Sequence, residues 1–143
     1  MEKQIWLFVS DPDDYNFEKL WQDAHVRWDG INGRHAQKYL RNVKKGDWVV
    51  CYHTAPRKAV FGLAEVTKGA YPDPHDDIGH FVVCDLKPRS RFKKEVPLER
   101  LRGHKTLSQM KFCTIQRLSV SPVTSPELHE ILKLAGEKGA SAN

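Results

Sequence analysis

Short apolar runs of strand length recur along this chain, and helical spacing is confined to its early part and its end. The strand-like runs cover residues 4–9, 48–53, 59–67, 79–87, 91–96 and 114–120. Gly62, inside the third run, predicts a β-bulge or a close backbone approach. So few long helices cannot cover both faces of an open sheet. The pattern therefore predicts an α+β domain around a strongly curved or closed sheet of about six strands.

Apolar residues at helical spacing predict helices over residues 16–24 and 34–43, with short helical turns at 97–101 and 106–110. A C-terminal helix is predicted with Ser125 as its N-cap and Pro126 at its first helical position. We expect one domain over residues 1–136 and a flexible tail over residues 137–143.

Charge is unevenly distributed. The formal net charge is +5, and ten basic but only two acidic side chains lie between Lys87 and Arg117. Such a segment attracts polyanions, of which nucleic acid is the commonest. The alternative is a solvated surface. The candidate phosphate-binding residues in this segment are Arg89, Arg91, Lys93, Lys94 and Lys105.

Several protein classes are not indicated by the sequence. No run approaches the roughly 20 apolar residues of a membrane span, and the N-terminal apolar run is too short for a signal peptide. We expect a cytoplasmic protein, or a nuclear one in a host with a nucleus, without a membrane partner. The three cysteines are far apart and predict neither a zinc site nor disulfides. His75, Asp76, Asp77 and His80 match no common metal signature, so we expect no metal, no cofactor and no catalytic residues.

Five segments in order resemble the EVE domain, a PUA-like family related to YTH-type readers of modified bases. They read I-W-L-F, W-D-G-I-N-G-R-H-A, K-K-G-D-W-V-V-C-Y-H-T, V-F-G-L-A-E-V-T-K-G-A-Y-P-D-P and R-L-S-V-S-P-V, and the resemblance covers residues 4–134. It implies a PUA-like β-barrel flanked by helices, with a pocket for a modified base of DNA or RNA, such as methylated or hydroxymethylated cytosine.

Two loops depart from the family pattern. Residues 30–33 read G-I-N-G where the family usually has G-V-R-N, and residues 9–12 read V-S-D-P where it usually has K-x-E-P after the first strand. The first departure puts Asn32 and Gly33 at the arginine and asparagine positions, which leaves the preferred base open.

A pocket for a single base needs aromatic faces to stack on and a few polar groups for the base edge. Trp28, in a glycine-bearing loop, is the predicted stacking face, and the alternative is a hydrophobic lid over the early helices. For Trp21 and Trp48 we expect core packing. The other candidate base-binding residues are Ser10, Asn32, Tyr52, His53, Thr54, Tyr71 and Asp73.

Two of these candidates have specific alternatives. His53 can donate or accept at a base edge or a phosphate, but it is also compatible with a solvent-facing strand end. Strand alternation puts it on the opposite face from Tyr52 and Thr54. Asp73 can accept from an exocyclic amino group, or it can bond its own turn.

The sequence is compatible with two functions. The first is a non-enzymatic reader of a modified base in an aromatic cage, whose biological output would need a separate effector protein. The second is a small ASCH-type PUA-like hydrolase of a modified nucleoside or nucleotide. Hydrolysis would need a titratable pair facing one pocket, which only His53 with Asp73 could supply.

Overall fold

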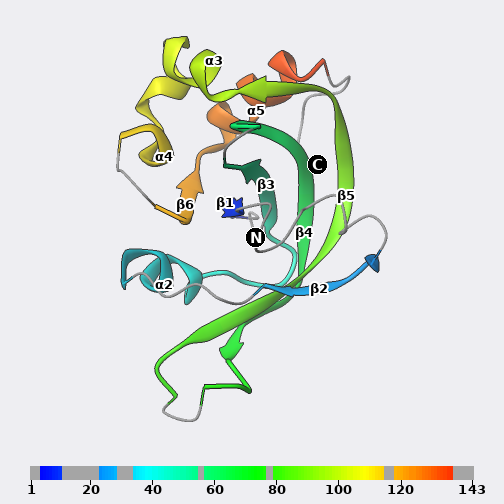
Figure 1. Cartoon of the computed structure of the whole chain (residues 1–143), viewed down its shortest axis with the longest axis vertical. Helices are drawn as coiled ribbons and strands as arrows, with labels where there is room; N and C mark the ends of the chain where they lie inside the picture. Colours follow the sequence, from blue (N-terminus) through cyan, green and yellow to red (C-terminus); the bar gives the residue numbers. More distant parts are fainter. Residues whose placement is uncertain are drawn as a thin grey trace.

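The computed structural model describes residues 4–10, 23–28, 34–54, 57–76, 79–114 and 118–136. These residues form one six-stranded mixed sheet in the order β2-β5-β4-β3-β1-β6 (Figure 1). The strands are β1 (Ile5–Ser10), β2 (Val26–Trp28), β3 (Trp48–His53), β4 (Ala59–Pro72), β5 (Val82–Pro97) and β6 (Val120–Val123). β1 runs parallel to β3, and every other neighbouring pair is antiparallel.

Helices occupy both sides of this sheet, which confirms the α+β class. They are α2 (Arg34–Leu40), α3 (Leu98–Gly103), the 3-10 helix η1 (Leu107–Gln109), α4 (Lys111–Thr114) and α5 (Ser125–Leu134). The predicted helix over residues 16–24 falls mostly outside the described residues. Within the described ranges, no helix is long and apolar enough to cross a membrane.

The sheet is strongly curved but not closed, so the prediction of a β-barrel is wrong. Among the described strands, β2 and β6 remain edges, of only three and four residues. Curvature comes from the long β4–β5 hairpin, whose pairing shifts register at four points. Gly62 lies at one of these shifts, and β3 and β4 shift at the same place, which confirms the predicted bulge.

Three predicted boundaries are wrong for physical reasons. Residues 79–87 and 91–96 belong to one strand, β5, which continues through Pro88 because this proline sits beside a register shift. The last strand is Val120–Val123, since the chain at Lys111–Thr114 is helical. The N-cap of α5 is Thr124 and not the predicted Ser125, so Pro126 is the second helical residue. The Thr124 hydroxyl accepts from the Glu127 backbone N–H, while the Glu127 carboxylate accepts from the Thr124 backbone N–H.

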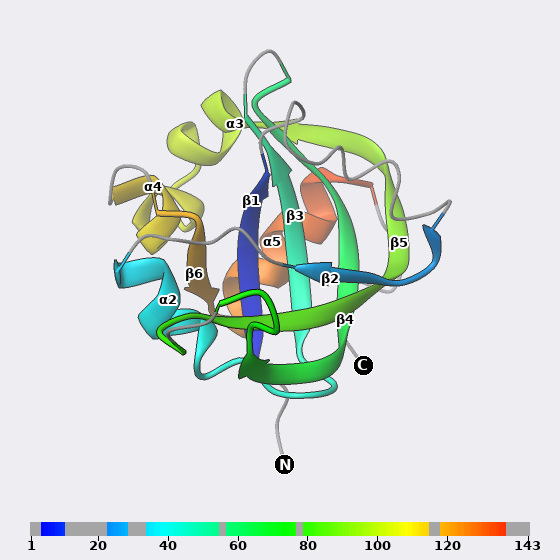
Figure 2. The ribbon, with the colours of Figure 1, turned by 60° about the horizontal axis from the view of Figure 1, so that its bottom comes forward.

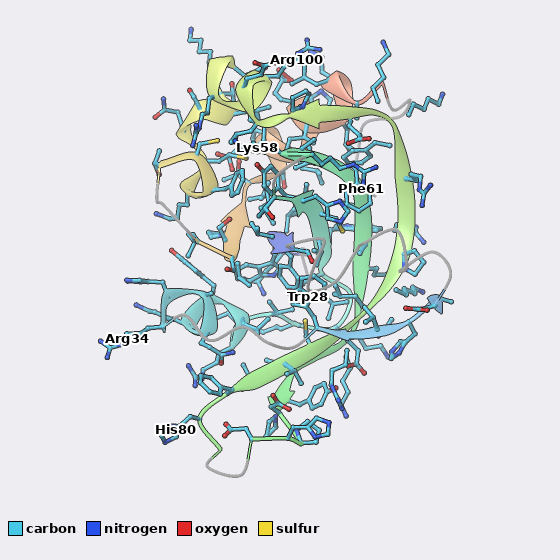
Figure 3. All side chains as sticks on the ribbon, in the orientation of Figure 1. Trp28, Arg34, Lys58, Phe61, His80 and Arg100 are labelled. Atoms are coloured by element: carbon cyan, nitrogen blue, oxygen red, sulfur yellow. The ribbon has the colours of Figure 1, made fainter. Side chains whose placement is uncertain are left out.

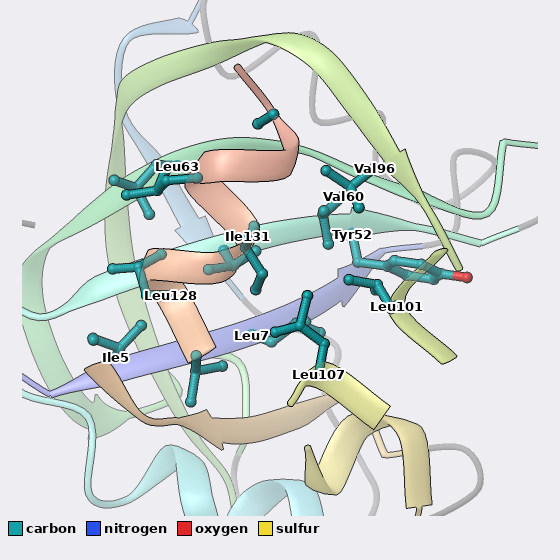
Figure 4. Close-up of a cluster of buried hydrophobic side chains, with 14 of the residues drawn as sticks. Ile5, Leu7, Tyr52, Val60, Leu63, Val96, Leu101, Leu107, Leu128 and Ile131 are labelled. Atoms are coloured by element: carbon teal, nitrogen blue, oxygen red, sulfur yellow. The ribbon is translucent and has the colours of Figure 1, made fainter. Parts of the chain in front are cut away.

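The two faces of the sheet carry separate cores. The first, the α5-side core, packs β-strand residues such as Leu7 and Val50 against Leu128 and Ile131 of α5 (Figure 4). The second, the α2-side core, packs Trp6, Phe8, Trp28, Cys51 and Phe61 with residues of α2. Figure 2 shows α5 behind β1 and β3, while β2 and the lower part of β5 cross in front of them.

Asp47 ties the start of β1 to the turn before β3. Its side chain is buried, and its carboxylate accepts from the Trp6 indole at 3.0 Å and from the Lys44 backbone N–H at 2.9 Å. It also accepts from the backbone and side chain of Gln4, at 3.2 and 3.3 Å. A buried carboxylate is tolerated only with such hydrogen-bond partners. Asp47, the aspartate of the K-K-G-D-W segment, therefore stabilises the fold.

Candidate functional site

Two polar side chains end neighbouring strands in the centre of the sheet. Ser10 closes β1 and His53 closes β3, and the two residues are paired in the parallel register. Their exposed fractions are only 5% and 1%. The backbone N–H of Thr54 donates to the Ser10 carbonyl at 3.0 Å, which holds the two chain ends together. Because parallel strands end at the same edge, the fold brings these residues together across 43 positions of sequence.

The His53 ring is fixed by an aromatic ring and a guanidinium. It stacks on Phe61 with centroids 4.4 Å apart and 22° between the planes. Arg57 Nη1 lies 3.0 Å from His53 Nδ1, and the guanidinium also lies over the Phe61 ring at 5.4 Å. Arg57 Nε in turn pairs with Glu95 Oε1 of β5 at 3.0 Å. Arg57, Phe61 and Glu95 were not among the predicted site residues. The bulge signal at Gly62 and the basic turn before β4 were their only sequence signals.

Trp28 lies on the same face of the sheet as His53 but not in a loop. It ends β2, which pairs with β5 opposite Cys84, and its exposed fraction is 5%. Its indole stacks on Phe8, two residues before Ser10, with centroids 5.7 Å apart and 29° between the planes. Sequence reasoning missed β2 because its three residues give too short a pattern. Trp28 and Phe61 both belong to the α2-side core, and Figure 3 shows Trp28 near β2 and Phe61 near β4. Asn32 lies outside the described residues.

Tyr52 does not share this face. It projects into the α5-side core, where it packs on Phe112 with centroids 4.6 Å apart (Figure 4). Burial raises the pKa of its hydroxyl, with a smaller opposing effect of Arg102. Strand alternation places Thr54 on the Tyr52 side as well. The structure therefore places Tyr52 and His53 on opposite faces of the sheet, so the two side chains do not face one pocket.

Tyr71 and Asp73 lie at the far end of β4. His53 pairs with Ala59 at the start of that strand, so Tyr71 follows after roughly 40 Å of strand path at about 3.3 Å per residue. The Tyr71 hydroxyl donates to Asp85 at 2.6 Å, and burial together with this bond raises its pKa to about 12. Asp73 Oδ1 accepts from the His75 backbone N–H at 2.9 Å, which is the turn-forming alternative.

The same separation applies to the one catalytic pair that the sequence offered. His53 and Asp73 were the only pair available for a hydrolase, and the structure places them at opposite ends of β4. Burial raises the pKa of the Cys51 and Cys84 thiols well above the usual range, so both stay protonated and are poor nucleophiles.

The predicted phosphate-binding residues divide between the two sides of β5. Phe92 and Val96 are buried in the α5-side core, so strand alternation directs Arg91, Lys93 and Glu95 to the other side. That side is the one on which Glu95 holds Arg57 beside His53.

The other three basic residues lie elsewhere. Arg89 lies over the ring of Trp48, a member of the α5-side core, and Lys94 donates its backbone N–H to Ala135 at the end of α5. Lys105 lies exposed between α3 and η1. The five predicted phosphate-binding residues therefore do not form one surface. Of these five, only Arg91 and Lys93 lie on the same side of the sheet as Ser10 and His53.

Several known proteins are similar to this chain in fold and in sequence. The EVE domain family model matches residues 4–134. Mouse thymocyte nuclear protein 1 is 32% identical over 90% of this chain and 72% of its own length. The structure of Rpa0253 from Rhodopseudomonas palustris superposes with a TM-score of 0.88 and 30% identity, over 93% of each chain.

A further structure contains nucleic acid. The human THYN1 protein, solved in complex with DNA containing 5-methylcytosine, superposes with a TM-score of 0.84 and 26% identity, over 95% of this chain and 99% of that chain. The chain belongs to the EVE domain family.

Proposed function

We propose that this chain is a non-enzymatic reader that binds DNA carrying a modified base such as 5-methylcytosine. The observation that carries the proposal is the match in fold, over nearly the whole chain, to a human protein solved with 5-methylcytosine-containing DNA. RNA carrying the same base is included in the test below, and any biological output would need a separate effector protein.

The base-binding site we propose lies at the edge where β1 and β3 end. Ser10 and His53 supply hydrogen-bonding groups there, and Trp28, Phe8 and Phe61 supply aromatic rings on the same face. A flipped or unpaired base needs this combination of polar groups and π-faces.

Phosphate contacts are assigned to Arg91 and Lys93, because these two basic residues lie on the same side of β5 as Arg57. Neutralising phosphates gives affinity without sequence information, and the buried pair would then select the base.

The test is a binding series with oligonucleotides that differ at one base. Cytosine, 5-methylcytosine and 5-hydroxymethylcytosine are compared in single-stranded and duplex DNA and in RNA. A pocket that accepts one extra methyl group discriminates by about 10- to 200-fold. Equal affinity for modified and unmodified bases in every context would refute the proposal.

A further inference from the structure

The outward face of α2 and the turn that follows it carry a row of exposed basic side chains, here called the α2 basic face. Its five residues are Arg34, Lys38, Arg41, Lys44 and Lys45. Arg34 and Lys38 are four positions apart on α2 and Arg41 follows three positions later, so these three side chains share one helix face. Residues 34–46 contain no acidic residue, and their five positive charges equal the formal net charge of the whole chain, +5. Figure 3 shows Arg34 projecting from α2 away from the core.

Within the described residues, none of the five side chains of the α2 basic face forms an ion pair. On β5, by contrast, Lys87 and Arg89 both lie close to Glu65, at 4.0 and 3.8 Å. The carboxylates of the turns beside α2 bind backbone or buried groups instead. Asp47 is buried and accepts from Trp6 and from backbone N–H groups, and Asp76 accepts from a backbone N–H of its own hairpin at 2.7 Å. The positive field of α2 is therefore not cancelled by paired carboxylates.

The helix that carries these cations is tied to both strands of the β4–β5 hairpin. The buried Gln37 amide bonds the backbone of Val82 on β5 twice: Nε2 donates to the carbonyl at 3.1 Å, and Oε1 accepts from the N–H at 2.9 Å. On β4, the Ala70 N–H donates to the Val43 carbonyl just after α2, at 3.0 Å. The basic side chains therefore extend from a fixed backbone, which reduces the cost of ordering the protein when a ligand binds.

The composition of this face favours nucleic acid over an acidic protein as its partner. The centre of a protein–protein interface is enriched in aromatic residues and depleted of lysine. The aromatic residue of α2, Tyr39, is half-buried and packs towards Trp6 instead, with ring centroids 6.3 Å apart. A phosphate backbone needs only cations, and it offers one charge per 3.4 Å along each strand. Residues 34–41 extend about 10 Å at 1.5 Å per residue, which matches about three phosphates.

We infer that the α2 basic face binds the phosphate backbone of the same DNA molecule whose modified base is read at Ser10 and His53. This inference rests on the proposed function. Ala36 and Leu40 of α2 pack in the same core as Trp28, so the helix lies on the side of the sheet that carries the proposed base site. The sequence-based assignment of phosphate contacts was confined to residues 87–117 and did not include α2.

The first experiment measures binding of the full chain to duplex DNA containing 5-methylcytosine at several salt concentrations. Arg34→Ala/Lys38→Ala should reduce the slope of log K against log salt by about 1.8 units, for two lost phosphate contacts. Both side chains are exposed and alanine favours helix, so the urea midpoint should not fall. Lys94→Ala/Lys111→Ala is the matched control, because it removes the same charge from exposed positions on the α5 side. An unchanged slope in the α2 variant, or equal losses in both variants, would overturn the inference.

The second experiment asks whether one DNA molecule contacts α2 and β5 together. Arg34→Ala/Lys38→Ala is combined with Arg91→Ala/Lys93→Ala, and the loss of slope should equal the sum of the losses of the two double variants. Titration at low salt should give one duplex per wild-type protein. Losses that do not add, or two duplexes per protein, would show that α2 binds a separate ligand and would overturn the inference.

Base preference separates this inference from the proposed function. The affinity ratio of 5-methylcytosine to cytosine should be the same in the wild-type protein and in Arg34→Ala/Lys38→Ala, because phosphate contacts carry no base information. A wild-type protein without base preference, together with a reduced slope in the α2 variant, would refute the proposed function but support α2 as a nucleic-acid-binding surface. Base preference with an unchanged slope would overturn the α2 inference alone and would make an acidic protein the next partner to test.

Discussion

The indole of Trp28 stacks on the phenyl ring of Phe8, with centroids 5.7 Å apart, and both rings are buried in the α2-side core. The last residue of the short edge strand β2 thereby contacts β1, which lies next to the opposite edge of the sheet. Trp28 consequently contributes to the core whatever else it binds.

Trp28→Ala should lower the free energy of unfolding by about 3–5 kcal/mol, because it removes a buried aromatic ring. This is more than expected for an exposed stacking residue. Trp28→Phe keeps a ring against Phe8 and should cost less. Urea denaturation measures both losses. The binding ratio of 5-methylcytosine to cytosine, measured on folded Trp28→Phe, then tests base stacking separately. A ratio equal to that of the wild-type protein would remove Trp28 from the site.

Arg91→Ala and Lys93→Ala should each weaken oligonucleotide binding and each reduce the salt dependence, by about one unit of the slope of log K against log salt. Both effects should be similar for modified and unmodified bases, since phosphate contacts carry no base information. Lys94→Ala is the matched control on the α5 side of the same strand. A slope that drops equally in all three variants would show that the side of β5 is irrelevant to binding.

Asp47→Asn should destabilise the fold by about 1–3 kcal/mol, because an amide nitrogen, which donates hydrogen bonds, replaces one carboxylate oxygen, which accepts them. Oδ2 alone accepts from Trp6, Lys44 and the Gln4 side chain. The measurement is the urea midpoint together with the near-ultraviolet signal of the tryptophans. Base preference should survive in the folded fraction, and its selective loss without destabilisation would contradict a structural role.

Gly69→Ala should also destabilise the protein, although Gly69 lies in the middle of a strand. A Cβ at this position would lie 2.9 Å from the Val43 carbonyl oxygen and 3.0 Å from the Lys44 Cα, both of which are backbone atoms. The turn before β3 would have to move away from β4. Gly103→Ala is the control, since nothing lies within 4 Å of its Cβ position. Equal melting temperatures for the two variants would contradict this close approach.

The sequence predicted the strands whose pattern is long and uninterrupted. β1, β3 and the start of β4 were expected nearly at their observed bounds, because apolar β-branched and aromatic residues run through them. β2 and the continuity of β5 were missed. The three residues of β2 are too few to show an alternating pattern. Pro88 suggested that the strand ends there, but the register shift beside Pro88 lets β5 continue through it.

The site was harder to predict than the fold. Alternation correctly separated His53 from Tyr52 on β3, but it could not show which face of the sheet would carry the site. That choice depends on the parallel pairing of β1 with β3 and on the packing of Phe61 and Arg57 against His53. Neither contact leaves a local signal. Asp47 and Gly69 lie in the segments that resemble the family, and both make close contacts with the turn before β3.

The position of β1 between β3 and β6 has a consequence for biosynthesis. β1 is made first, yet both of its neighbours come later, and β6 lies close to the C-terminal helix. Pairing between such distant segments folds slowly, since a large loop must close before any contact forms. The edge of β1 that faces β6 therefore stays unpaired until β6 has left the ribosome. During that interval the apolar residues Ile5–Phe8 are the segment most in need of protection by a chaperone.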